Sequence, residues 1–122
     1  MKLPGPDHPI TIVPAALRVR AKVGPHVIAD TAHAMMLTEA SYGPVPYLPR
    51  EDVEMGFLSK TDHHSYCPYK GEASYYSLHI DGEMRENCVW SYEDPYPAMQ
   101  AIKGLLAFYP NQVEVYTVDP EV

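Results

Sequence analysis

A short segment near the middle of the chain holds the residues best suited to chemistry. Cys67 and Lys70 stand three positions apart in the run Cys-Pro-Tyr-Lys-Gly, where Pro68 stiffens the backbone and Gly71 allows a sharp exit. A turn of this length brings the ammonium group near the sulfur, and a nearby cation favours the thiolate, which is the nucleophilic form. The spacing therefore predicts a reactive thiolate or an anion-binding Cys–Lys pair, with a buried, inert thiol as the alternative.

The histidines beside this segment give only a weak indication of a metal site. His63 and His64 are adjacent, so in an extended segment they point in opposite directions and only one can join Cys67. A structural zinc site needs four ligands, usually in closely spaced pairs, and the sequence has no CxxC motif. We therefore expect no metal ion and no other cofactor.

Aromatic side chains form a second group of candidate site residues. The chain has ten tyrosines against two phenylalanines and one tryptophan, Trp90. Phenol and indole groups offer both stacking area and a hydrogen-bonding atom. Trp90 either fills the core or lines a small-molecule cavity with three tyrosines, Tyr47, Tyr75 and Tyr92. Arg18 belongs to a basic stripe typical of a solvated face, but turned inward it could bind a carboxylate or phosphate.

Strands are expected to position these residues. Residues 17–23 alternate between apolar and polar side chains, and residues 27–30 return as the second strand of a hairpin. Residues 73–80 and 83–92 predict another hairpin around Asp81-Gly82. Similar but shorter patterns predict strands at 34–39, 53–57, 105–109 and 113–118, the last two as a hairpin.

Loops and one short helix complete the expected architecture. The proline-rich residues 41–49 and the polar residues 60–71 predict loops. A short helix is expected at about residues 95–103, with Asp94 as its N-cap. Short strands separated by turn signals are typical of a mainly β sandwich, barrel or rolled sheet. We expect residues 1–16 to form an arm and residues 17–122 a single β domain.

Composition and charge narrow the range of functions. The 122 residues are 46% hydrophobic and 20% charged, as expected of one globular domain. A formal net charge of −7 argues against nucleic-acid binding through a basic surface, and no apolar run approaches the ~18 residues of a membrane span. With two cysteines and no signal-like start, we expect a cytoplasmic chain with free thiols.

A series of short motifs, spread over roughly residues 17–118, resembles the bacterial domain of unknown function 427 family. The motifs are Arg18-Val19-Arg20, Val27-Ile28-Ala29-Asp30-Thr31, Leu37-x-Glu39, Tyr47-Leu48-Pro49-x-x-Asp52-Val53, Cys67-Pro68-Tyr69-Lys70-Gly71-x-Ala73-x-Tyr75, Val89-Trp90-x-Tyr92-x-x-Pro95 and Ala107-Phe108-Tyr109. The cysteine and tryptophan motifs are the most specific. Ser65 stands where the family often has threonine, so the hydroxyl is kept, whereas Pro46 precedes a single Tyr47 where the family often has two tyrosines.

The resemblance implies an antiparallel, tent-like β fold in which two sheets are pinned along one side. The same fold is found in zinc-bearing domains such as methionine sulfoxide reductase B and the ligand-binding domain of cereblon. Since this chain lacks their paired CxxC motifs, the zinc is not carried over. The family is catalogued as nucleotidyltransferase-like, but the sequence shows no glycine-rich phosphate loop and no Asp-x-Asp pair.

Together these observations predict a small-molecule pocket on the tent. Strand parity would turn the candidate side chains toward one cavity, namely Arg18, Glu39, Tyr47, Ser65, Cys67, Lys70, Tyr75, Trp90 and Tyr92. If the protein is an enzyme, Cys67 would be the nucleophile, Lys70 its electrostatic activator and Glu39 the acid/base or the group that orients Lys70.

Other interpretations stay open at this point. The cavity could be a non-catalytic module that binds a metabolite or peptide, or it could support nucleotidyl transfer. Lys70 and Glu39 could also form a buried ion pair that only fixes the loop. An edge strand among so many hairpins would suit a homodimer.

Overall fold

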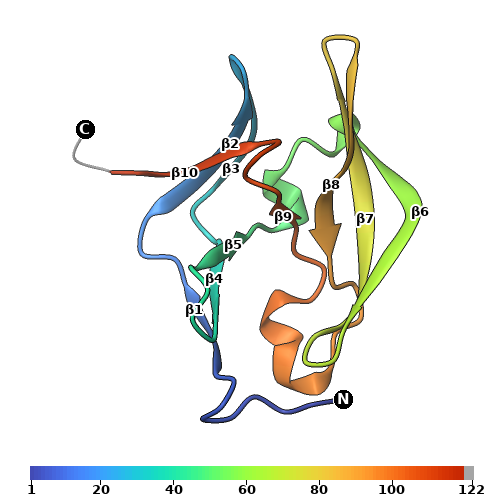
Figure 1. Ribbon diagram of the computed structural model, residues 1–122. Coiled ribbons are helices and arrows are strands. Elements are labelled where there is room, and N and C mark those ends of the chain that lie inside the picture. The colour runs from blue at the N-terminus through green and yellow to red at the C-terminus, as the bar shows by residue number, and fades with distance from the viewer. Residues whose placement is uncertain (120–122) are drawn as a thin grey trace.

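The computed structural model describes residues 1–119, and these are built mainly of antiparallel strands, as the sequence predicts (Figure 1). Residues 120–122 of the expected β domain lie outside the described part. The described strands form three sheets. The first sheet has the strand order β10-β2-β3 (Glu114–Val118, Arg18–Val23, His26–Thr31). The second has the order β1-β4-β5 (Ile10–Pro14, Met35–Glu39, Val45–Tyr47). The third has the order β6-β7-β8-β9 (Leu58–Cys67, Gly71–Ile80, Glu83–Ser91, Ala107–Phe108).

The two strongest hairpin predictions are confirmed. In β2, Val19, Ala21 and Val23 are buried and alternate with more exposed basic residues, so the strand covers the core with one face. The β7–β8 turn places Asp81 at φ +52° and Gly82 at φ +75°. Two consecutive left-handed residues match the right-handed twist of the flanking strands, which is why an Asp-Gly pair stands here.

The third sheet faces the other two across the molecule, with β5 and β9 between them (Figure 1). Leu48, which follows β5, and Leu106, which precedes β9, exchange two backbone hydrogen bonds of 2.8 Å. A large apolar core that includes Val19, Leu78 and Val89 lies between the sheets. A smaller one, with Leu37, Met99 and Ile102, lies under the candidate site.

Several element boundaries differ from the sequence predictions, mostly where strands lie at sheet edges. Residues 58–67, largely predicted as a loop, form the edge strand β6, whose side chains are mainly exposed and therefore lack an apolar alternation. Within the predicted loop 41–49, residues 45–47 form β5, an edge position that tolerates Pro46. Residues 10–14, expected in an arm, form β1 and pair with β4.

Two other local predictions were wrong in detail. Residues 53–57 were expected as a strand, but only Val53 makes a β-bridge, to Ala29, between the 3₁₀ turns η1 (Arg50–Asp52) and η2 (Met55–Phe57). The expected helix is the 3₁₀ segment η3 (Pro97–Ile102), which begins later because Pro97 holds the preceding Tyr96 in an extended conformation at ψ 156°.

The last two strands do not form a hairpin. Strand β9 pairs with β8, while β10 pairs with β2 in another sheet. No helix within residues 1–119 has the length and apolar character needed to cross a membrane.

Candidate functional site

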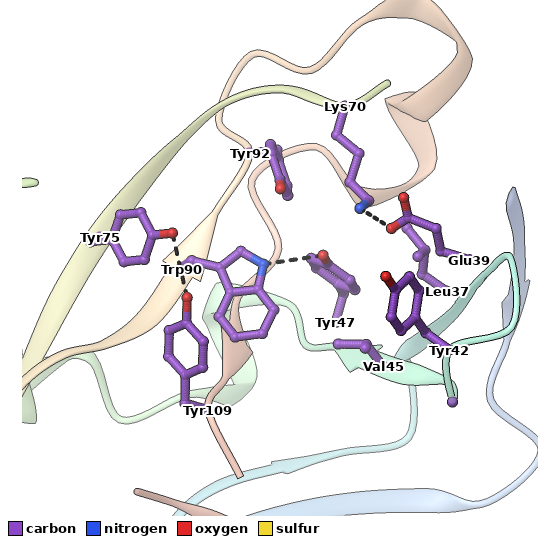
Figure 2. Close-up of a pocket in the computed structure, with 11 residues that line it drawn as sticks. Leu37, Glu39, Tyr42, Val45, Tyr47, Lys70, Tyr75, Trp90, Tyr92 and Tyr109 are labelled. Carbon is purple, nitrogen blue, oxygen red and sulfur yellow. Dashed lines mark hydrogen bonds and ion pairs between the residues drawn. The ribbon is translucent and has the colours of Figure 1, made fainter. Parts of the chain in front are cut away.

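A pocket of about 390 Å³ opens above the smaller core, between β4 and β5 on one side and the third sheet on the other (Figure 2). This volume lies within the range of small-molecule sites. Aromatic side chains dominate the lining, which consists of Leu37, Glu39, Tyr42, Gly43, Val45, Tyr47, Lys70, Tyr75, Trp90, Tyr92 and Tyr109.

Strand geometry explains why these residues share one cavity. Leu37 and Glu39 are two positions apart on β4 and therefore lie on the same face. Tyr75 on β7 stands directly opposite Trp90 on β8, so their side chains also point to the same side of the sheet. Tyr92 continues that face two positions later.

One end of the pocket carries a cation–carboxylate pair. The Lys70 ammonium group, whose side chain is only 10% exposed, donates a short hydrogen bond to Glu39 Oε1. His8 Nε2 lies 2.7 Å from the other carboxylate oxygen, Oε2. Burial favours the neutral acid, but the hydrogen bonds from Lys70 and His8 outweigh it and lower the pKa of Glu39. Glu39 is therefore an anion held from two sides.

Cys67 lies beside this pair but outside the pocket lining. Its Sγ is 4.0 Å from Lys70 Nζ, so the predicted proximity of sulfur and ammonium is present. Gly71 makes the exit from the turn at φ +109°, where a Cβ would lie 3.7 Å from the backbone of Asp94, Pro95 and Tyr96. The second thiol, Cys88, is buried in the larger core, and burial raises its pKa. Only Cys67 is thus available to act near the pocket.

The aromatic wall is held together by its own polar atoms. Trp90 Nε1 donates to Tyr47 Oη at 3.1 Å, and the two rings meet edge to face at 6.2 Å. Trp90 also packs on Tyr109, with ring centroids 4.6 Å apart and planes tilted by 47°. Burial raises the pKa values of Tyr47 and Tyr92 well above the usual range for phenols. Burial and the Tyr75 hydroxyl raise the pKa of Tyr109 to about 12, so these hydroxyls stay neutral.

The structure brings together most of the residues predicted from the sequence. The predicted residues that line the pocket are Glu39, Tyr47, Lys70, Tyr75, Trp90 and Tyr92. Ser65 lies behind the lining, with its hydroxyl 2.8 Å from Tyr75 Oη. Arg18 is elsewhere: it is exposed on β2, where its Nε donates to Asp30 at 2.5 Å.

Besides Leu37, Gly43 and Val45, three polar residues of the site were not predicted. Tyr109 follows β9 and belongs to the Ala-Phe-Tyr motif, which was a usable signal. Tyr42 stands at the rim with 70% of its surface exposed, in a loop whose sequence gives no sign of a site. His8 was not among the predicted site residues, yet it contacts Glu39 and stacks on Tyr69 with ring centroids 4.1 Å apart.

No group of three or more His, Cys, Asp or Glu side chains within residues 1–119 is placed to hold a metal ion. The pocket itself offers one carboxylate, one ammonium group and neutral hydroxyls among its described residues. This set can exchange hydrogen bonds with a polar ligand and stack on its ring.

Comparison with known proteins places the chain in a family. A family profile described as Domain of unknown function (DUF427), with the label NTP_transf_9, matches residues 11–119. No curated protein matches the chain. The match covers nearly the whole sequence and agrees with the motifs around Cys67 and Trp90, so this chain belongs to the DUF427 family.

Proposed function

We propose that this protein binds a small, uncharged, ring-containing molecule in the pocket around Trp90. The observation that carries the proposal is the convergence of aromatic faces and a buried Lys70–Glu39 pair on one cavity of about 390 Å³. Concave, mostly apolar sites with a few convergent polar groups are the usual form of small-molecule sites.

Charge within the pocket supports a neutral ligand. Lys70 is the only cation among the described lining residues, and Glu39 already compensates it. An incoming phosphate would have to compete with that carboxylate inside a partly desolvated site, which is costly. This balance argues against a nucleotide as the ligand, although the family label points to nucleotidyl transfer.

A thiol-dependent reaction is the second candidate. It is favoured by the 4.0 Å separation of Cys67 Sγ and Lys70 Nζ, because a neighbouring cation stabilises a thiolate. Cys67 does not line the pocket, however, so a bound molecule would first meet Lys70 and the tyrosines. Binding without covalent chemistry therefore explains the arrangement without requiring the bound molecule to reach Cys67.

Trp90 makes the proposal directly testable. As the only tryptophan, it gives a single indole N–H signal in a ¹H–¹⁵N NMR spectrum, and that group lies in the pocket wall. We expect a screen of neutral ring fragments to yield compounds that shift this signal saturably. Binding should survive Cys67→Ser and be lost in Trp90→Ala, when followed by calorimetry.

Tyr66→Phe is a matched control, because Tyr66 is exposed and pairs with Tyr96 outside the pocket lining. Fragments that bind equally well to Trp90→Ala would show that the pocket is not the binding site. Loss of binding in Cys67→Ser with an intact fold would instead favour the thiol-dependent reaction.

A further inference from the structure

We infer that the molecule bound in this pocket is a monosaccharide-like polyol, that is, a saturated ring bearing several hydroxyl groups. The inference rests on the proposed function and names its ligand class. Three observations carry it: the inclination of the aromatic rings, the kind of polar atoms on the wall, and the neutral Lys70–Glu39 pair.

The aromatic rings do not form a slot for a flat ligand. Tyr109 is inclined by 47° to Trp90, and Tyr47 stands at 89° to it. No ring contact among residues 1–119 sets another ring parallel to the indole. A nucleobase gains most from parallel faces on both sides. A saturated ring needs only one aromatic face to contact its C–H bonds, so it can pack on the indole without a second ring parallel to it.

The polar atoms of the wall suit hydroxyl groups. A phenol both donates and accepts a hydrogen bond, and a sugar hydroxyl has the same two capacities. Tyr47 Oη accepts the bond from Trp90 and keeps its own proton to donate. The Tyr92 side chain is largely buried, but its hydroxyl keeps access to the pocket and makes no hydrogen bond to any other residue in the described part of the chain. A ligand hydroxyl would provide the partner that Tyr92 lacks.

The Lys70–Glu39 pair suits two neighbouring hydroxyls. Lys70 has three N–H donors, of which one goes to Glu39 and another points to Cys67 at 4.0 Å. One hydroxyl can accept from Lys70 while the next donates to Glu39, and no net charge has to be neutralised. Figure 2 shows both charged groups at the same end of the cavity, across from Trp90.

The same geometry indicates binding rather than hydrolysis of a sugar. Glycosidases generally use two carboxyl groups on either side of the glycosidic bond. Glu39 is the one carboxylate among the described lining residues, and Lys70 and His8 hold both of its oxygens. The volume of about 390 Å³ is at the small end for ligand sites and suits one sugar unit.

A titration of the full chain with three matched groups of compounds tests the inference. The neutral polyols are methyl β-glucopyranoside, methyl β-galactopyranoside, N-acetylglucosamine and myo-inositol. The flat compounds are adenosine and uridine, and the anion is glucose 6-phosphate. We expect at least one polyol to shift the Trp90 indole signal saturably, the nucleosides to leave it in place, and glucose 6-phosphate to bind more weakly than methyl β-glucopyranoside.

Two variants sharpen the result. Tyr92→Phe removes a hydroxyl that has no native partner within residues 1–119, so its melting temperature should stay unchanged while polyol affinity falls about fivefold. Glu39→Gln should weaken binding by about tenfold, because it replaces a charged acceptor with a neutral one. Tyr66→Phe serves as the control and should leave affinity unchanged.

The outcomes separate the two proposals. Saturable binding of a nucleoside at Trp90, with none of the polyols, would overturn the polyol inference and leave the proposed function standing. Polyol binding that Tyr92→Phe and Glu39→Gln do not weaken would also overturn it. If neither these compounds nor the fragment screen shift the Trp90 signal, both proposals fail.

Discussion

Two cation–glutamate pairs, Arg50–Glu93 and Lys70–Glu39, differ in their surroundings. Arg50 donates to Glu93 at 3.0 Å, to Tyr76 Oη at 2.8 Å, to Ser91 Oγ at 3.2 Å and to the Gly104 carbonyl at 2.7 Å. Protein groups therefore accept hydrogen bonds from all three guanidinium nitrogens of Arg50. Lys70 pairs with Glu39 at the edge of a cavity and keeps donor capacity toward it.

The difference lies in how many hydrogen-bonding positions the protein leaves unoccupied. Arg50 joins the turn after β5 to the third sheet and to the segment before β9, so it ties together parts that are distant in the chain. The Lys70–Glu39 pair has one open side. An ion pair is thus a structural joint when protein groups occupy its hydrogen-bonding positions, and a candidate site only when a cavity adjoins it.

The largest stability loss is expected from Arg50→Met. The change removes the partner of four groups and leaves Glu93 with Lys60, whose Nζ lies 2.6 Å from Oε1. We expect the free energy of unfolding to fall by about 2–3 kcal/mol, measured by urea denaturation. The control is Arg18→Met, which breaks the exposed pair with Asp30 and should cost less than about 1 kcal/mol. Equal losses would refute the structural role of Arg50.

A smaller loss is expected from Lys70→Met. Glu39 keeps the contact to His8 and can be hydrated from the pocket, so we expect a loss of about 1–2 kcal/mol in the same assay. The double variant Lys70→Met/Glu39→Gln should recover part of that loss, because it no longer leaves a carboxylate without its ammonium partner. A loss in Lys70→Met larger than that in Arg50→Met would mean that this pair, too, is mainly structural.

Acid should remove the contribution of both carboxylates. Burial opposes ionisation of Glu39 and Glu93, but hydrogen bonds, from Lys70 and Lys60 respectively, lower both pKa values below the ordinary 4.5. A carboxyl with a lowered pKa in the folded state stabilises the fold above the unfolded pKa and loses that effect as pH falls. We expect stability to decline from about pH 5 to pH 3, and less steeply in Glu39→Gln and in Glu93→Gln. Slopes unchanged in both variants would contradict this account.

The smallest effect is expected at the thiols. Cys88 is buried and its pKa is raised, whereas Cys67 is half-buried beside Lys70, so iodoacetamide at pH 7 should modify only Cys67. Mass spectrometry of the native protein should show a single adduct. If Lys70 activates the thiol, Lys70→Met should slow the reaction severalfold. An unchanged rate would leave the pocket as a binding site without a reactive thiol.

Some features were predictable from the chain because they depend on few residues. The turn from Cys67 to Gly71 sets the sulfur beside the ammonium group by short-range geometry alone. Alternation along β2 and the Asp-Gly turn predicted the two long hairpins correctly, since strand periodicity and turn conformation are local properties. Part of the aromatic wall was predictable because side chains alternate along a strand, which places Trp90 and Tyr92 on one face.

Other features had no local signal. The edge strand β6 resembles a loop because its side chains are mainly polar and exposed. The 3₁₀ segment η3 starts late because Tyr96, which precedes Pro97, is extended. Arg18 alternates as a site residue would, yet its strand turns it toward Asp30. His8 lies 31 positions from Glu39 and meets it only after residues 10–14 pair with β4.

The amino-acid sequence alone determined the strand-rich architecture, the close approach of Cys67 and Lys70, and the supply of neutral aromatic hydroxyls. Only the tertiary structure decided that the Lys70–Glu39 pair borders a cavity while protein groups accept hydrogen bonds from all the guanidinium nitrogens of Arg50. The physical reason is that backbone preferences act over a few residues, whereas the space beside a side chain depends on how separate sheets pack.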